Sequence, residues 1–230
     1  MIDYILYGLF CLAFFISLIA EARVFFAFRK YSQREAASGR RAEEIVEEML
    51  LSAGVRGVRI ERVRGHMTDH YDPKTRVLRL SDSVYGERSV AAVGVAAHEA
   101  GHAIQHAEGY APLRLRTKMV PITGFASRAS WILILLGALL MSFATLGYYF
   151  MMVGVALFSV TTLFQLVTLP CEMDASKRAL AAMEGMGYYS SRELGESKKV
   201  LSAAAMTYVA GIVVSMIQLL RFVMILRGND

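Results

Sequence analysis

The chain has 230 residues, of which 55% are hydrophobic and 20% charged, and its mean hydropathy is +0.42. This composition is too apolar for an ordinary soluble protein and too poor in charge for a disordered one. Its two cysteines are too few for a disulfide framework. The net charge of +5 would allow a nucleic-acid binder, but the basic residues lie beside apolar segments, so we expect no nucleic-acid partner.

Three apolar segments predict about four membrane-spanning helices. Residues 4–20 carry no charge, and these 17 residues are at the lower limit for a span. Residues 129–171 form an uncharged stretch of 43 residues, which suffices for two spans if a tight turn interrupts it at 145–149, around Gly147. A last apolar run covers 203–220. We expect a retained N-terminal anchor rather than a cleaved signal peptide, because no basic residue precedes the first apolar segment.

The positions of Lys and Arg predict the orientation of these spans. Of the 25 basic residues, 18 lie between residues 21 and 129 and five lie between residues 172 and 202. An intervening helical hairpin would return these two segments to the same side of the membrane. Because basic loops stay in the cytoplasm, we expect the N-terminus outside and both hydrophilic segments inside.

The first hydrophilic segment is predicted to form a compact lobe with two helices and a small β-hairpin. Residues 38–54 carry apolar residues at helical spacing and end at Gly54. Residues 58–63 and 76–80 alternate as strands do, so we expect a short antiparallel pair, whose second strand could accept a substrate peptide along its edge. Residues 89–108 are predicted to form the second helix.

This second helix contains the motif His98-Glu99-Ala100-Gly101-His102. Residues four apart share a helix face, so His98 and His102 can direct their imidazoles at one metal ion. A catalytic zinc site needs such a pair of neutral nitrogens, a third protein ligand and an open position for water. Glu99 would accept the proton of that water as it attacks a polarised carbonyl. The alternative is a helix whose histidines cap the helix or pair with local acids.

The third ligand has to come from outside the motif. The long zincin signature requires a Gly and a His where this chain has Gln105 and Glu108, so that subclass is excluded. Glu108 itself remains a local candidate. Glu172 is the better candidate, because it is the first charge after the 43-residue uncharged stretch and the hairpin would return it to the side of the lobe.

Two further residues are candidates for catalysis. His70 and Tyr71 lie in a stretch rich in Asp and Pro, and either side chain could donate a hydrogen bond to the oxyanion of a tetrahedral intermediate. The alternative is an ordinary turn in which His70 is structural.

The chain resembles the YugP-type bacterial membrane zinc metallopeptidases and, more distantly, the HtpX-like and CAAX-prenyl membrane endopeptidases. The resemblance covers nearly the whole chain and is carried by TDHYDP (68–73), LS (80–81), AAHEAGHAIQ (96–105) and LPCEMDAS (169–176). It implies one Zn²⁺ per chain, bound by His98, His102 and Glu172. It also implies Glu99 as the base and a place in the bacterial cell membrane.

One position departs from the more distant endopeptidases. Those proteins commonly place an acid four residues after the ligand Glu, where the acid orients a histidine, and here that position is Ser176. Asp174 lies two residues after Glu172 and is expected on a different helix face.

Together these patterns predict a mainly α-helical integral membrane protein. We expect about four transmembrane helices and a cytoplasmic zincin-type lobe that contains a small β-hairpin and the H-E-x-x-H helix. The expected regions are an N-terminal anchor, the lobe, a transmembrane hairpin, a cytoplasmic return segment with the third ligand, and a transmembrane or tilted last helix. Their expected bounds are 1–21, 22–128, 129–170, 171–202 and 203–226.

The predicted function is that of a membrane-embedded zinc-dependent endopeptidase. It would hydrolyse peptide bonds of membrane or membrane-proximal proteins on the cytoplasmic side, using a metal-activated water. The expected partners are the lipid bilayer and a protein or peptide substrate, and a homo-oligomer or a regulatory membrane partner stays open. The alternative is a non-catalytic membrane scaffold or regulatory protein whose metal is structural or absent.

Overall fold

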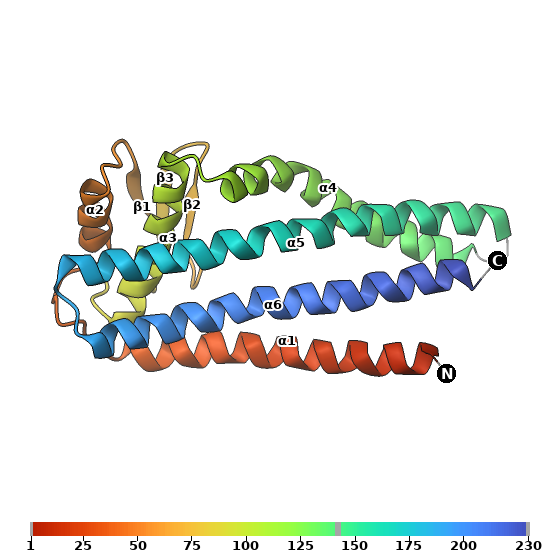
Figure 1. The fold of residues 1–230 in the computed structure, drawn as a ribbon, viewed down its shortest axis with the longest axis horizontal. Coiled ribbons are helices and arrows are strands. Elements are labelled where there is room, and N and C mark those ends of the chain that lie inside the picture. The colour runs from red at the N-terminus through yellow and green to blue at the C-terminus, as the bar shows by residue number, and fades with distance from the viewer. Residues whose placement is uncertain (1, 141–143, 229–230) are drawn as a thin grey trace. The chain divides into compact units, whose positions relative to one another are not determined.

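The computed structural model describes residues 2–140 and 144–228 and confirms a mainly α-helical chain (Figure 1). The elements follow in the order α1 (Ile2–Ser32), α2 (Ala42–Ser52), β1 (Arg59–Val63), β2 (His70–Asp72), β3 (Val77–Ser81), α3 (Val90–Ala107), α4 (Ala111–Leu139), α5 (Ala144–Met186) and α6 (Ser191–Arg227).

Four of these helices contain segments long and apolar enough to cross a membrane, as the sequence predicts. The segments are Tyr4–Ser32, Ala111–Leu139, Thr145–Gly185 and Ser191–Arg227. Large apolar side chains on them are exposed, among them Leu135 at 71% and Leu139 at 75%. Such exposure is costly in water and ordinary in lipid.

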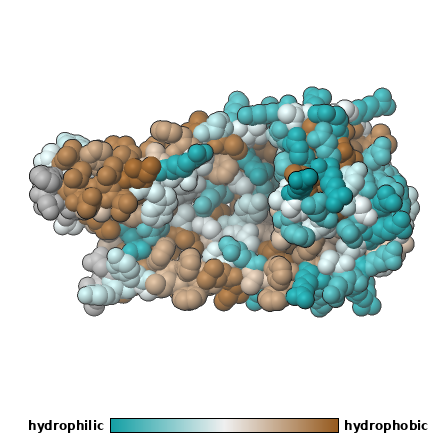
Figure 2. Space-filling model, turned by 180° about the vertical axis from the view of Figure 1, so that it is seen from behind, coloured by the Kyte–Doolittle hydropathy of each residue, from teal (hydrophilic) through white to brown (hydrophobic). Residues whose placement is uncertain are grey.

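The chain divides into two compact units. The helical unit comprises Met1–Ile19, Leu115–Leu169 and Thr207–Asp230, and the lobe unit comprises Ala20–Arg114 and Pro170–Met206. Because the long helices continue from one unit into the other, the lobe unit contains parts of α1, α5 and α6 as well as the strands. Figure 2 shows hydrophobic side chains along the helical unit and mostly hydrophilic ones over the surface of the lobe unit.

The predicted turn at residues 145–149 is wrong. These residues lie in the first turns of α5. Helix α4 ends at Leu139, and α5 begins at Ala144. Gly147 instead allows a close contact between helices, because a Cβ atom there would lie 2.6 Å from the carbonyl oxygen of Leu140. Small residues let helices in lipid pack closely, so this glycine marks the packing of the hairpin and not its turn.

The sheet has the strand order β1-β3-β2. Strand β1 is parallel to β3, whereas β2 is antiparallel to β3. The predicted antiparallel pairing of 58–63 with 76–80 is therefore wrong, because β2 lies in their connection and reverses the chain once more. The hairpin is β2–β3. Since β3 is paired on both sides, its edge is not open to a substrate peptide, contrary to the expectation from the sequence.

Both predicted helices of the lobe are confirmed. Helix α2 ends before Gly54, whose φ is +70°, and α3 begins after Ser89, whose hydroxyl accepts a hydrogen bond from the backbone N–H of Ala92. The apolar stripe of α2 is buried and consists of Ala42, Ile45, Val46, Met49 and Leu50. This stripe packs into one core with β3, α3 and the adjoining turns of α5 and α6. The core surrounds α3 and holds it in place.

Candidate metal centre

Helix α3 presents His98 and His102 on one face. The two residues are one turn apart, and their ring centroids are 4.8 Å apart. His102 is buried, and His98 is partly buried. Because most residues of α3 are buried in the lobe core, the two rings have a rigid support.

Gly101, between the two histidines, allows α5 to approach α3. A Cβ atom at Gly101 would lie 2.5 Å from the carbonyl oxygen of Ala175, which leaves no room for any other residue. Glu172 lies three residues before Ala175, one turn away on the same face of α5. The close contact at Gly101 therefore places the Glu172 carboxylate opposite the two imidazoles.

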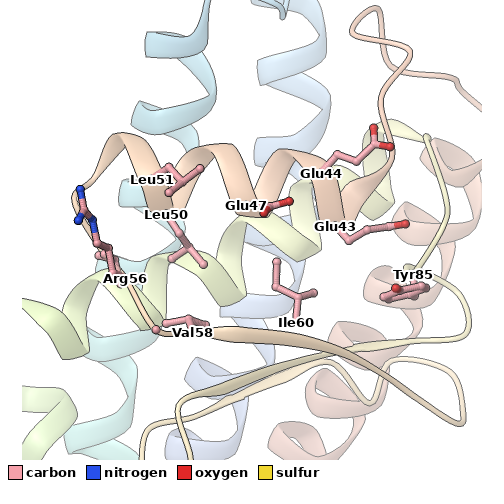
Figure 3. A pocket seen from close by; sticks show the side chains of 11 residues that line it. Glu43, Glu44, Glu47, Leu50, Leu51, Arg56, Val58, Ile60 and Tyr85 are labelled. Atoms are coloured by element: carbon pink, nitrogen blue, oxygen red, sulfur yellow. The ribbon is translucent and has the colours of Figure 1, made fainter.

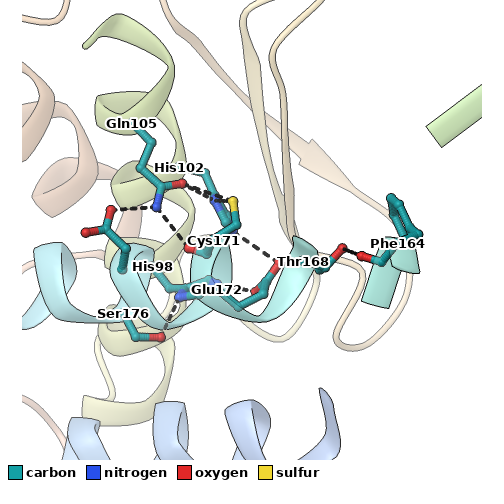
Figure 4. Close-up of polar contacts among 9 residues, drawn as sticks. His98, His102, Gln105, Phe164, Thr168, Cys171, Glu172 and Ser176 are labelled. Carbon is teal, nitrogen blue, oxygen red and sulfur yellow. Dashed lines mark hydrogen bonds and ion pairs between the residues drawn. The ribbon is translucent and has the colours of Figure 1, made fainter. Parts of the chain in front are cut away.

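Three ligand atoms of His98, His102 and Glu172 converge within 4.8 Å of one another (Figure 4). The Glu172 carboxylate oxygens lie 3.1 Å from Nε2 of His98 and 3.5 Å from Nε2 of His102. Ligands of a tetrahedral Zn²⁺ at 2.0–2.1 Å would lie about 3.3 Å apart. The donor set and its spacing thus fit such an ion.

The other ring nitrogens are already bonded, as Figure 4 shows. Nδ1 of His98 lies 3.0 Å from the Ser176 hydroxyl, and Nδ1 of His102 lies 2.9 Å from Oε1 of Gln105. With a proton on each Nδ1, both Nε2 atoms are left free to bind a metal. Ser176 thus contacts a histidine at the position where the more distant endopeptidases have an acid.

Gln105 also connects His102 to Asp174. Its side-chain Nε2 donates to Asp174 Oδ2 at 2.7 Å and to the carbonyl of Cys171 at 2.9 Å. Asp174 therefore acts on His102 through the Gln105 amide, although its position suggested a different helix face. The sequence analysis does not predict this role of Gln105, although its spacing of three residues from His102 on a helix is a signal for the contact.

The environment of His102 favours its charged form when no metal is bound. Burial opposes that charge, but hydrogen bonds to Cys171 and Glu172 and the negative charge of Glu99 outweigh the burial and raise the pKa of His102. A proton and a metal ion thus compete for the same imidazole.

Glu99, the predicted base, is buried at the centre of α3. Its charge acts on His102, and it follows the ligand His98 directly in the sequence. A buried carboxylate next to candidate metal ligands is suited to accept a proton from water.

The two other predicted catalytic residues lie on β2 and have different contacts. The ring of His70 is exposed, with Nδ1 2.8 Å from the carbonyl of Thr68 and Nε2 3.4 Å from a guanidinium nitrogen of Arg79. The Tyr71 hydroxyl lies 2.8 Å from Nδ1 of His106, one turn beyond His102 on α3. Tyr71 is thus tied to the metal-binding helix, whereas His70 is bonded within the hairpin.

A separate hollow of about 430 Å³ lies between α2 and the chain entering β1 (Figure 3). Three glutamates of α2 line it, but two of them have structural partners. Glu43 accepts a hydrogen bond from the N–H of Gly86, and Glu44 accepts one from the N–H of Arg41. None of the predicted site residues is among those that line this hollow.

The chain matches a known protein family. The model of the family described as "Putative neutral zinc metallopeptidase" matches residues 6–227. The chain belongs to this family. It is also 47% identical over 216 residues to "Putative membrane protease YugP" of Bacillus subtilis (strain 168), and the match covers 94% of each chain. No solved structure matches the chain significantly. The resemblance stated from the sequence motifs is thereby confirmed.

Proposed function

We propose that this protein is a zinc-dependent endopeptidase of the bacterial cell membrane that cleaves membrane or membrane-proximal proteins. The observation that carries this proposal is the convergence of ligand atoms from His98, His102 and Glu172 within 4.8 Å. The family description and the relative's name, which calls that protein a membrane protease, support peptide hydrolysis as the chemistry.

In this proposal, different residues of the chain bind the metal, transfer the proton and orient the ligands. His98, His102 and Glu172 hold one Zn²⁺, which when bound polarises a peptide carbonyl and makes a water molecule acidic. Glu99 takes the proton from the attacking water and returns it to the leaving amine. Ser176 and Gln105 keep the two imidazoles turned toward Glu172.

We further propose that a residue of β2 donates the hydrogen bond to the oxyanion. Of the two candidates, we favour Tyr71 over His70. This assignment is supported by the hydrogen bond that joins the Tyr71 hydroxyl to His106, on the same helix as the two histidine ligands. His70 has its nearest contacts within the hairpin, with Thr68 and Arg79.

The proposed site faces the cytoplasm. The four apolar helices cross the bilayer, and the lobe unit, which comprises Ala20–Arg114 and Pro170–Met206, forms a zincin-type lobe on the inner side. This orientation is supported by the basic residues, because 20 of the 25 lie in those two segments. Substrates would therefore be peptide segments that reach the inner membrane surface.

The Glu99→Gln variant tests whether the site is catalytic. We expect it to bind zinc as the wild type does and to lose at least about 10²-fold in hydrolysis of an unfolded membrane protein, because the proton acceptor is gone. The matched control is Glu108→Gln, at the exposed C-cap of the same helix, and it should retain activity. A Glu99→Gln protein that hydrolyses the substrate normally would contradict the proposal, and a zinc-loaded wild type without hydrolysis would favour a scaffold role.

A further inference from the structure

A cavity of about 740 Å³ lies between the end of α1 and the beginning of α6, within the lobe unit. This volume is in the range of pockets that bind small molecules, about 300–1,000 Å³. Tyr31, one of its lining residues, is buried and packs against Ala91 and Val200, so this wall is fixed by the core. The residues that line the cavity do not include those of the proposed metal centre.

The lining of this cavity is strongly basic. Lys30 and Arg34 come from the α1 side, and Arg192 and Lys199 come from α6. The single lining carboxylate, Glu196, is buried and accepts from Arg34 and, at 3.3 Å, from Arg192. Four cations and one carboxylate leave a net charge of +3, which favours an anionic ligand.

The helix faces that carry these charges become apolar away from the cavity. Phe26 is 64% exposed and lies four residues before Lys30, on the same face of α1. On α6, Arg192, Lys199 and Met206 are spaced by seven residues and share a face, and Met206 is 51% exposed. Both helices are candidate membrane spans. A ligand with an anionic head and an apolar tail matches a basic cavity that is followed by apolar helix faces.

We infer that this cavity binds the phosphate group of an anionic phospholipid, whose acyl chains lie along the exposed apolar residues of α1 and α6. Basic pockets at the ends of membrane helices attract anionic headgroups, and each Lys or Arg near the membrane surface strengthens binding by about a factor of five. A zwitterionic lipid carries a compensating ammonium group and gains less from a net charge of +3. The inference depends on the membrane placement proposed above, but not on peptidase activity.

A pair of matched double variants tests this inference on the full-length protein. Lys30→Gln with Lys199→Gln removes two lining charges, whereas Arg29→Gln with Lys198→Gln removes two exposed charges one residue away on the same helices. Native mass spectrometry in detergent micelles would measure binding of added phosphatidylglycerol and of phosphatidylcholine. We expect wild type and control to prefer phosphatidylglycerol, and the lining variant to bind it about 30-fold more weakly.

Three results would overturn the inference. The first is a wild type that binds both lipids equally, and the second is an equal loss in both double variants, which would indicate diffuse surface charge. The third is complete displacement of the lipid by millimolar inorganic phosphate, which would make free phosphate the ligand. Zinc content, measured on the same samples, should stay at the wild-type level in both variants, so a failure here is distinguishable from a failure of the proposed metal site.

Discussion

The lobe unit and the helical unit both use a glycine to bring two helices into close contact, but with different results. At Gly101 the contact of α3 with α5 places a carboxylate opposite two imidazoles. At Gly147 the close neighbours are backbone atoms of Leu140 and Gly137, and no metal-ligating residue is among them. The comparison indicates that close packing alone stabilises helices, and that it builds a site only where polar side chains flank the contact.

The largest effect should come from Gly101→Ala. The added methyl group would lie 2.5 Å from the Ala175 carbonyl oxygen, so α5 has to move and carry Glu172 away from the histidines. We expect loss of zinc together with about 1–3 kcal/mol of stability. Zinc content by atomic emission and thermal unfolding of the purified protein would measure both.

Gly147→Ala is the matched control for that prediction. Its methyl group would lie 2.6 Å from the Leu140 carbonyl oxygen, so the loss of stability should be similar while zinc stays bound. Retention of full zinc by Gly101→Ala, or loss of zinc from Gly147→Ala, would break the distinction between the two contacts.

A smaller effect is expected from residues that orient the ligands. Gln105→Ala removes the acceptor of the His102 Nδ1 proton and its link to Asp174 and should weaken zinc binding about 10- to 100-fold. Ser176→Ala removes one contact with His98, so it should weaken zinc binding by an amount at the lower end of that range. Competition with a zinc chelator would give both dissociation constants. Unchanged constants in folded variants would show that these hydrogen bonds serve only packing.

Zinc binding should also depend on pH, by an amount comparable to the loss expected for Gln105→Ala. Hydrogen bonds and the charge of Glu99 raise the pKa of His102 against the effect of burial, so this imidazole is protonated at neutral pH before the metal binds. Zinc has to displace that proton, and each unit of pH lowered should weaken binding about tenfold. Chelator competition between pH 6 and pH 8 would measure the slope, and a flat profile would contradict the raised pKa.

Local patterns in the sequence predicted the elements that depend on local physics. The apolar spacing and Gly54 located α2, the helical pattern of residues 89–108 located α3, and uncharged length located four apolar helices. The motif likewise predicted that His98 and His102 share a face.

The features that the sequence did not reveal depend on contacts between distant segments. The parallel pairing of β1 with β3 follows from a short strand, β2, that was interpreted as a turn. The bond of Gln105 to Asp174 joins α3 to α5 and has no signature within either helix. Gly147 suits a turn or a close contact between helices equally well in the sequence, and only the position of Leu140 decides between the two.

The proposed metal centre depends on Glu172 as its third ligand, and the zinc content of the purified protein shows whether Glu172 binds the ion. We predict about one zinc per chain in the purified wild type and in Glu108→Ala, which removes the local alternative, and little or none in Glu172→Ala. Full zinc in Glu172→Ala, or its loss from Glu108→Ala, would contradict the assignment of Glu172.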